Sequence, residues 1–204
     1  MSIRLGVLIS GSGTNLQAII DRIASGTIDA SIELVVSSRA DAYGLMRAQA
    51  AGIQTLTMDK GFYDEEHSAD RIIAAEMRSR SVDYILMAGY MRMVHAPLLD
   101  AFPNRIVNIH PALLPSFKGA HGIRDAYEYG VKIAGVTVHF ADDRYDCGPI
   151  IAQRALAVEE GWTLDEFEAH IHEIEHDLYP EVVGLLVAGR VRVTAGGKVE
   201  ILPT

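Results

Sequence analysis

Residues 3–16 read IRLGVLISGSGTNL, a nearly continuous apolar run followed by a glycine-rich turn. A continuous run, as opposed to an alternating one, is typical of a strand buried on both faces, as in a parallel sheet. Beyond the turn, apolar residues recur with helical spacing at Leu16, Ile19, Ile20 and Ile23. This strand–turn–helix unit predicts an α/β fold.

The strand–helix alternation continues through the first half of the chain. Further strands are predicted over residues 32–37, 53–58 and 84–88, and the helices over residues 15–25, 40–51 and 68–79. Right-handed crossovers between such strands give a Rossmann-like open sheet, mostly parallel, with helices on both faces. The length of the chain indicates a single domain.

The second half of the chain is less regular. Its patterns predict three more strands, over residues 105–109, 135–140 and 149–157. They also predict a short helix over residues 123–129. A long helical stretch over residues 163–189 contains Pro180, which we expect to break the helix because proline has no N–H to donate. Residues 191–194 and 198–201 flank two glycines and predict a small C-terminal hairpin.

Composition narrows the classes of function. The formal net charge of −9 argues against a nucleic-acid binder, since polyanion binding depends on clustered Lys and Arg. Cys147 is the only cysteine, which excludes an intrachain disulfide and favours a reducing, cytoplasmic setting. No stretch approaches the roughly 20 apolar residues of a membrane span. Residues 1–5 lack the pattern of a signal peptide, so we expect no membrane partner.

The glycine-rich turn at residues 10–15 indicates an anion site. Glycine lets the backbone approach a ligand closely, and the following helix presents unpaired N–H groups and a partial positive charge. The turn lacks the Gly-Lys-Ser/Thr of a P-loop, and Leu16 stands where a dinucleotide fingerprint has its third glycine. This favours one terminal phosphate. The alternative is a tight turn in which Thr14 or Asn15 caps the helix.

Asn108 and His110 lie two residues apart at the end of a predicted strand. Both then point to one face at the edge where open α/β sheets bind ligands. His110 exchanges a proton near neutral pH, and Asn108 can donate to a developing oxyanion. With Asp146 on a later loop, these are the groups that acyl transfer to an amine requires. On residue types alone, Asn108 and His110 are equally consistent with a structural pair.

Other reactive residue types are less informative. Cys147 follows Asp146, and because a neighbouring carboxylate disfavours the thiolate, we interpret Cys147 as incidental. His172 and His176 have the spacing of a zinc helix, in the pattern His-Glu-x-x-His. The sequence offers no clear third ligand. We therefore expect no metal, with a zinc site as the alternative.

Six motifs follow one another along the chain: GSGTNLQ (residues 11–17), MAGYMRM (87–93), NIHPALLP (108–115), GVTVHF (135–140), DCGP (146–149) and EHDLYP (175–180). Together they resemble the phosphoribosylglycinamide formyltransferase family, which uses 10-formyltetrahydrofolate in purine synthesis. The likeness spans nearly the whole chain. It implies one formyltransferase domain over residues 1–204, with a phosphate-binding half at 1–100 and a catalytic and folate-binding half at 101–204.

The resemblance also implies the residues of the site. The catalytic residues of the family correspond to Asn108, His110 and Asp146. Its ribonucleotide site corresponds to Gly13, Thr14, Asn15 and Glu175. Its folate pocket corresponds to Arg92, Met93, Val94, Asn108, Asp142 and Asp146, and the loop over residues 142–146 is expected to close over the folate. Its supporting positions correspond to His121 and His139.

The mechanism that the resemblance implies is direct. The amine of glycinamide ribonucleotide, held by Glu175, attacks the formyl carbon of the folate. Asn108 and protonated His110 stabilise the oxyanion. Asp146 keeps His110 charged and, through water, helps move the proton to the departing folate nitrogen. Neither a covalent enzyme intermediate nor a metal is expected, and the partners are the two small substrates.

Two positions depart from the family pattern. Cys147 stands where glycine or alanine is expected, and His172 stands where a glutamine-like residue faces the substrate, which leaves its contact open. Formyltetrahydrofolate deformylase and methionyl-tRNA formyltransferase resemble the same core, but each usually carries an extra domain for which 204 residues leave no room. A non-catalytic nucleotide-binding module needs only the glycine-rich turn. We expect a monomer or a homodimer.

Overall fold

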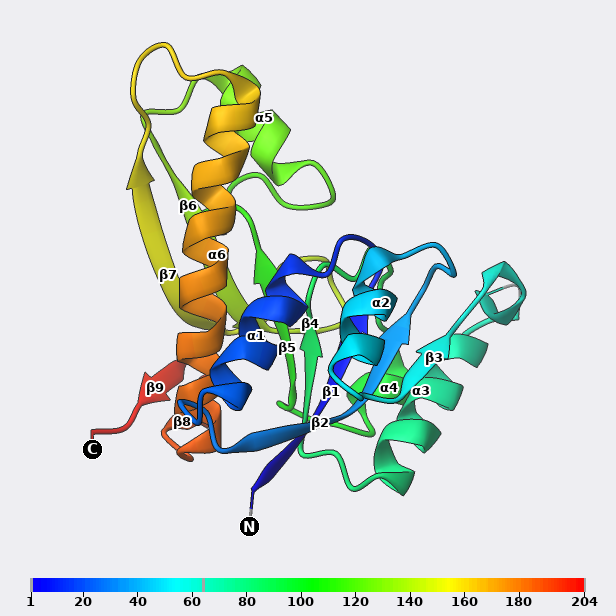
Figure 1. Ribbon diagram of the computed structural model, residues 1–204. Coiled ribbons are helices and arrows are strands. Elements are labelled where there is room, and N and C mark those ends of the chain that lie inside the picture. Colours follow the sequence, from blue (N-terminus) through cyan, green and yellow to red (C-terminus); the bar gives the residue numbers. More distant parts are fainter. Residues whose placement is uncertain (1, 64, 204) are drawn as a thin grey trace.

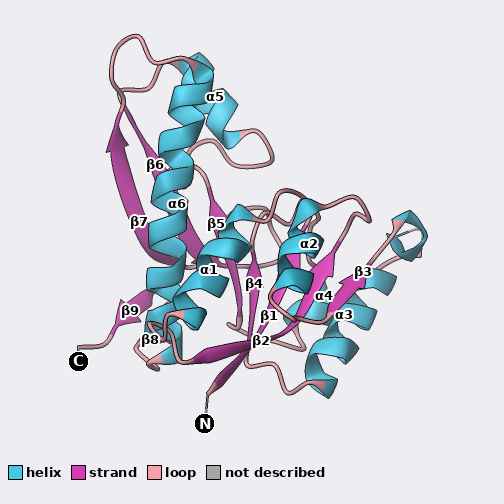
Figure 2. Ribbon diagram, in the orientation of Figure 1, coloured by secondary structure: helices cyan, strands magenta, loops and turns pink. Residues whose placement is uncertain are grey.

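The computed structural model describes residues 2–63 and 65–203 as an α/β fold (Figure 1). Seven strands form the main sheet: β1 (Ile3–Ile9), β2 (Ala30–Ser37), β3 (Thr55–Thr57), β4 (Tyr84–Met87), β5 (Ile106–His110), β6 (Ile133–Phe140) and β7 (Ile150–Ala157). The helices are α1 (Thr14–Ala24), α2 (Tyr43–Ala50), α3 (Ser68–Ser79), α4 (Ala96–Leu99), α5 (Gly122–Tyr129) and α6 (Leu164–Val187), with a 3₁₀ turn η1 (Lys60–Tyr63). Figure 2 shows the helices packed around the strands.

The strand order is β3-β2-β1-β4-β5-β6-β7. The pairs from β3 to β5 are parallel, whereas β6 pairs antiparallel with both β5 and β7. The prediction of an open, mostly parallel sheet is therefore confirmed, with the antiparallel strands at one edge. The register of β5 and β6 places Asn108 opposite His139. One predicted catalytic residue thus lies beside one predicted supporting residue.

Helices cover both faces of the sheet, as the continuous apolar runs predict. Successive side chains of β1 point to opposite faces. Leu5, Val7 and Ile9 pack into a core cluster with residues of α1 and α6, while Leu8 packs into a second cluster with residues of α3 and α4. All four side chains are fully buried. In Figure 1, α1 and α6 cross in front of the sheet.

The expected helix break at Pro180 is wrong, because α6 continues through this residue. Proline in a helix interior costs about 3 kcal/mol, since it removes a hydrogen bond and crowds the preceding turn. Here Tyr179, Pro180 and Val183 are all buried, and the packing of this helix face outweighs the local cost. The helix begins at a capping box, in which Thr163 and Glu166 each accept from the other's backbone N–H.

Two short elements, η1 and α4, are absent from the sequence prediction. Each is four residues long, which is too short for helical periodicity to be visible. The predicted C-terminal hairpin is confirmed as β8 (Val191–Val193) paired antiparallel with β9 (Val199–Ile201). None of the helices within residues 2–63 and 65–203 combines the length and apolar character that a membrane crossing needs.

Tyr179 ties α6 to two neighbouring strands from within the core. Its hydroxyl lies 3.1 Å from the carbonyl oxygen of Met87 and 2.9 Å from that of Val107. We expect Tyr179→Phe to lower the free energy of unfolding by about 1–2 kcal/mol, because a buried hydrogen bond is lost. Urea unfolding measures the change, with Tyr129→Phe at an exposed position as the control. Equal stability of the two variants would contradict the expectation.

Candidate active site

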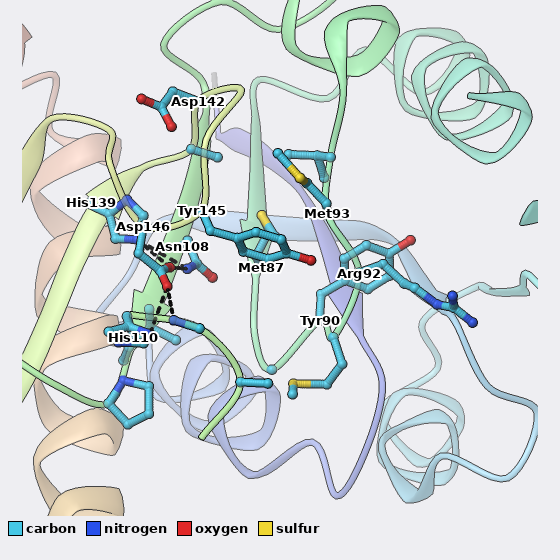
Figure 3. A pocket seen from close by; sticks show the side chains of 18 of the residues that line it. Met87, Tyr90, Arg92, Met93, Asn108, His110, His139, Asp142, Tyr145 and Asp146 are labelled. Atoms are coloured by element: carbon cyan, nitrogen blue, oxygen red, sulfur yellow. Dashed lines mark hydrogen bonds and ion pairs between the residues drawn. The ribbon is translucent and has the colours of Figure 1, made fainter. Parts of the chain in front are cut away.

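A pocket of about 370 Å³ lies at the carboxyl ends of β4 and β5 (Figure 3). Its wall comes from these strands, from the segment after β4 and from the loop between β6 and β7. The lining includes Asn108, His110, Asp146 and Glu175. Residues far apart in the sequence therefore converge at the edge where open α/β sheets bind ligands.

Asp146 lies at the centre of the polar group in this pocket. Its Oδ2 accepts a hydrogen bond from the backbone N–H of Gly119 at 2.7 Å and lies 3.5 Å from Nδ1 of His110. Its Oδ1 lies 3.5 Å from Nδ2 of Asn108 and 3.6 Å from Nε2 of His139. The side chains of both histidines and of Asp146 are buried. The structure thus brings the three expected catalytic residues together.

His110 is held in one tautomer. Its Nε2 lies 2.8 Å from the carbonyl oxygen of Phe117, which can only accept, so Nε2 carries a proton and Nδ1 faces Asp146. Burial lowers the pKa of His110 below its usual value, and the charge of Asp146 offsets this shift only in part. In the free site, burial therefore works against the protonated form of His110 that the resemblance implies for the reaction.

His139 orients the amide of Asn108. Nδ1 of His139 donates to the carbonyl oxygen of Phe140 at 2.8 Å, which leaves Nε2 as an acceptor. This Nε2 lies 3.2 Å from Nδ2 of Asn108 and takes one of the two amide hydrogens. The other hydrogen has only the longer 3.5 Å contact with Asp146. It is the donor that a ligand in the pocket can engage.

The loop between β6 and β7 holds Asp146 in a strained backbone conformation. Its φ of 51° is left-handed, which is costly for a residue other than glycine. A Cβ on Gly148 would lie 1.9 Å from the last carbonyl oxygen of β6, so only glycine fits there. Burial raises the pKa of Asp146, but the hydrogen bond from the N–H of Gly119 and the proximity of His139 and His110 outweigh it and hold this pKa below its usual value. Asp146 is therefore a carboxylate at neutral pH.

The glycine-rich turn leads into α1 and has Gly13 at the N-cap, with a φ of 71°. A Cβ on Gly13 would lie 2.5 Å from Cα of Gly44, so the close packing against α2 requires glycine here. No side chain caps α1, which rules out the capping alternative. Arg47 donates from Nε to the carbonyl oxygen of Ser12 at 2.9 Å and adds a cation beside the turn. Sequence reasoning missed Arg47 because no motif surrounds it.

Glu175 is buried on α6 and lines the pocket beside this turn. Its Oε2 accepts hydrogen bonds from Nδ2 of Asn15 at 3.2 Å and from Nδ1 of His172 at 2.8 Å. Both bonds fall on the same oxygen, so Oε1 is the atom left for a ligand. His172, which departs from the family pattern, therefore makes a hydrogen bond to Glu175.

Arg92, Met93 and Val94 line the pocket, and Figure 3 shows Arg92 and Met93 across it from Asp146. The guanidinium of Arg92 stacks over the ring of Tyr63, 4.4 Å from its centroid. Its charge is thereby directed away from the catalytic group, and this segment presents a largely apolar wall. Such a wall suits a flat, aromatic ligand.

The other predicted site residues divide into two groups. Asn15, His139 and Asp142 line the pocket, whereas Gly13, Thr14 and His121 do not. His121 is exposed at the N-cap of α5. Sequence reasoning missed two aromatic residues of the lining, Tyr90 and Tyr145. Tyr90 stands inside a motif that the sequence already showed, so it could have been found there.

The zinc alternative at His172 and His176 gains no third ligand in the described chain. Their rings are stacked with centroids 6.3 Å apart. His172 instead contacts two carboxylates, with Nδ1 at 2.8 Å from Glu175 and Nε2 at 3.4 Å from Glu168. Over residues 2–63 and 65–203, no metal-ligating group of three or more includes either histidine.

The pair of His172 and Glu175 makes stability depend on pH. Hydrogen bonding to Glu175 raises the pKa of His172 above its usual value. The stabilisation is then complete below the unfolded pKa of about 6.5, and it is lost as the pH rises through the higher folded pKa. We expect His172→Gln to destabilise the protein more at about pH 5.5 than at about pH 9.

Urea unfolding of the wild type and the variant at both pH values checks this expectation. His170→Gln is the matched control, because its partner Glu173 is exposed and the pair is therefore weak. Its pH-dependent difference should be smaller. An equal loss of stability at both pH values in His172→Gln would contradict the ion pair.

The chain has close relatives in sequence and in structure. Residues 3–183 match the formyl transferase family. The phosphoribosylglycinamide formyltransferase of Bacillus subtilis is 39% identical over 184 residues, which are 90% of this chain and 94% of that protein. The trifunctional purine biosynthetic protein adenosine-3 of Gallus gallus is 39% identical over 97% of this chain, which covers 20% of that protein. The crystal structure of glycinamide ribonucleotide transformylase 1 from Symbiobacterium toebii matches with a TM-score of 0.95 and 49% identity, over 99% of this chain and 95% of that one.

Proposed function

The chain belongs to the formyl transferase family, and on that premise we propose that it transfers the formyl group of 10-formyltetrahydrofolate to the amine of glycinamide ribonucleotide. The products are formylglycinamide ribonucleotide and tetrahydrofolate, in purine biosynthesis. One observation carries the proposal: Asn108, His110 and Asp146 meet in a pocket that has an anion-binding turn nearby and an apolar wall opposite.

Attack of the amine on the formyl carbon places negative charge on the formyl oxygen. The second amide hydrogen of Asn108 is available to this oxygen, and Nδ1 of His110 faces the same space. The developing negative charge favours the protonated form of His110. It therefore raises the pKa of His110, as the carboxylate of Asp146 also does. His110 takes up a proton from solvent water as the substrates bind, stabilises the oxyanion as a cation, and returns this proton to solvent when the products leave.

The proton of the attacking amine must reach the folate nitrogen as the formyl group leaves it. A water hydrogen-bonded to Asp146 accepts the amine proton and passes it to that nitrogen. One carbon–nitrogen bond forms as the other breaks, and no covalent bond to the protein is required. Much of the acceleration comes from positioning and from preorganised electrostatics.

The ribonucleotide binds with its phosphate at the start of α1. The backbone N–H groups around Gly13, Thr14 and Asn15 are donors there, and Arg47 adds positive charge. Oε1 of Glu175 accepts a hydrogen bond from the glycinamide amine. Because Asn15 contacts Glu175 directly, the phosphate end and the amine end are positioned by one connected set of side chains.

The folate binds against the apolar wall at residues 92–94. Tyr90 and Tyr145 add aromatic surface for its ring system. Asp142 and Asp146 lie on the same loop, so closure of this loop over the folate also sets the position of the catalytic carboxylate. His139 supports the site by orienting Asn108.

Several further properties complete the proposal. The chain is one domain, in which residues 1–100 bind the phosphate and residues 101–204 carry catalysis and the folate. The protein works in the cytoplasm as a monomer or homodimer. It binds neither nucleic acid nor membrane. Its formyl transfer uses no metal. The single cysteine and the net charge of −9 are consistent with this setting.

Tetrahydrofolate release in the presence and absence of glycinamide ribonucleotide tests the proposal. We expect release that depends on the ribonucleotide. Release in its absence would instead indicate a deformylase that passes the formyl group to water. Binding of the ribonucleotide without any release would indicate a non-catalytic nucleotide-binding module.

A further inference from the structure

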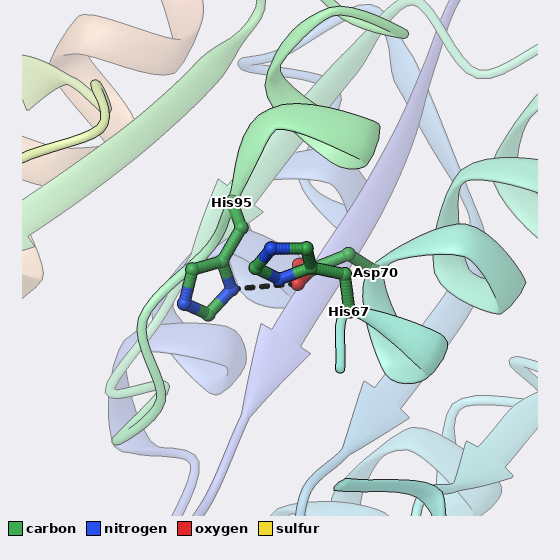
Figure 4. Close-up of side chains that lie close together, drawn as sticks. All are labelled: His67, Asp70 and His95. Carbon is green, nitrogen blue, oxygen red and sulfur yellow. Dashed lines mark hydrogen bonds and ion pairs between the residues drawn. The ribbon is translucent and has the colours of Figure 1, made fainter. Parts of the chain in front are cut away.

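His67, Asp70 and His95 form a second cluster of reactive side chains, separate from the pocket lining (Figure 4). Each offers one ligand atom, and these three atoms lie within 4.8 Å of one another. Asp70 stands in the first turn of α3, and the two histidines immediately precede α3 and α4. In the part of the chain that the structure describes, this is the only group of three or more potential metal ligands.

Helix capping does not explain the two histidines. Each occupies the N-cap of its helix, where Ser, Thr, Asp and Asn are preferred because their oxygens accept from the first N–H groups. Neither histidine makes a side-chain capping bond. His67 also has a left-handed φ of 58°, which is unfavourable for a residue other than glycine. Its ring centroid lies 4.6 Å from that of His95, so the two rings face each other instead of the helix ends.

Asp70 is the buried anchor of the cluster. Its Oδ2 lies 2.8 Å from Nδ1 of His95, and its side chain is only 8% exposed. The side chains of His67 and His95 are 34% and 39% exposed, so an ion from solvent can reach them. Glu66 adds a second carboxylate at the open side, with Oε1 at 3.5 Å from Nε2 of His67. The local charge therefore favours a cation.

We propose that His67, Asp70 and His95 bind a divalent first-row transition ion, of which Zn²⁺ fits best. Two imidazoles and one carboxylate are a ligand set typical of such ions. Tetrahedral Zn²⁺ places its ligand atoms about 3.4 Å apart, since each lies about 2.0–2.2 Å from the metal. Small rotations of the two half-exposed rings close the present spacing to this value. Water or Glu66 completes the fourth position.

The ion would connect two parts of the fold. His67 and Asp70 belong to the start of α3, whereas His95 follows Val94, which lines the pocket wall. Binding would therefore fasten this wall to α3 and stabilise the folded state, because the unfolded chain does not hold the three ligands together. The site does not depend on the proposed formyl transfer, since metal binding alone reports on it.

Calorimetric titration of the metal-free protein with Zn²⁺ alone tests the site. His67→Ala is the informative variant, because it removes one ligand and leaves the contact between Asp70 and His95 intact. We expect its Zn²⁺ affinity to fall at least about tenfold. His170→Ala is the matched control, since His170 is also half-exposed beside a glutamate, and its affinity should equal that of the wild type. At one Zn²⁺ concentration, the rise in Tm should be equal in the wild type and in this control, and smaller in His67→Ala.

Two results would overturn the proposal. One is a wild-type protein that does not bind Zn²⁺. The other is equal Zn²⁺ affinity in the wild type and His67→Ala, which would place any bound ion elsewhere, for example at the histidines of the pocket. Asp70→Asn gives a second reading, because it must also weaken Zn²⁺ binding while circular dichroism confirms that the variant is folded.

Discussion

His110→Ala is expected to lower kcat by about 10²–10⁴-fold, the range over which a positioned proton-exchanging group accelerates a reaction. The substitution removes the imidazole whose Nδ1 faces Asp146 and the pocket. The oxyanion then keeps only the amide of Asn108. Binding of glycinamide ribonucleotide should change little, because the phosphate turn does not contact His110. Steady-state formyl transfer measures kcat, and calorimetry with the ribonucleotide alone measures binding.

The control for this experiment is the same substitution at a half-exposed position outside the pocket. His170 lies on α6, stacked on the ring of Trp162, and does not line the pocket. His170→Ala should keep the kcat of the wild type. Urea unfolding of His110→Ala shows whether loss of the bond to Phe117 affects the fold. A folded His110→Ala enzyme with near-normal turnover would exclude His110 from the mechanism.

The elements of this fold that sequence predicts are those whose signal is local. The apolar run of β1 and the helical spacing of α3 gave bounds identical to those of the structure. The wrong prediction of a helix break at Pro180 arises because the helix there is stabilised by non-local packing. Proline disfavours a helix locally, whereas the burial that keeps α6 continuous through Pro180 depends on packing against strands distant in sequence. A single-residue preference cannot report on such packing.

In the site, too, local relations could be predicted from the sequence, whereas contacts between distant segments could not. Asn108 and His110 could be paired from their spacing on one strand, whereas Asp146 was joined to them by its chemistry, because the sequence does not show how closely a later loop approaches that strand. The hydrogen bond from the N–H of Gly119 to Asp146 has no signature in the sequence, because a backbone donor is set by loop geometry alone. The lowered pKa of His110 also depends on burial, which residue type does not reveal.

Contacts between distant helices were equally invisible. Asn15 meets Glu175 only because α1 packs against α6. His67 and His95 meet because the starts of α3 and α4 lie together, and neither histidine stands in a recognisable metal motif. The departure at His172 was visible in the sequence, but its partner was not. In each of these contacts, the sequence shows the residues, but only the structure shows which residue contacts which.

Asp146→Asn should lower kcat by about a thousandfold or more while the shape of the site is kept, as expected for a carboxylate that supports a catalytic histidine. The N–H of Gly119 requires an oxygen at the Oδ2 position, so the new amide nitrogen must replace Oδ1. That nitrogen then faces Nε2 of His139, and Asn108 loses an acceptor. The negative charge beside His110 and the base for the proton-carrying water disappear together.

The pKa of His110 separates this electrostatic role of Asp146 from a merely structural one. The carboxylate raises that pKa against the effect of burial, so Asp146→Asn should lower it further. A titration of the His110 ring signal by NMR measures the change, and the binding of glycinamide ribonucleotide alone serves as the control for an intact site. Near-normal turnover would remove Asp146 from catalysis. Lost turnover with an unchanged pKa of His110 would show that Asp146 acts on the water and not on the imidazole.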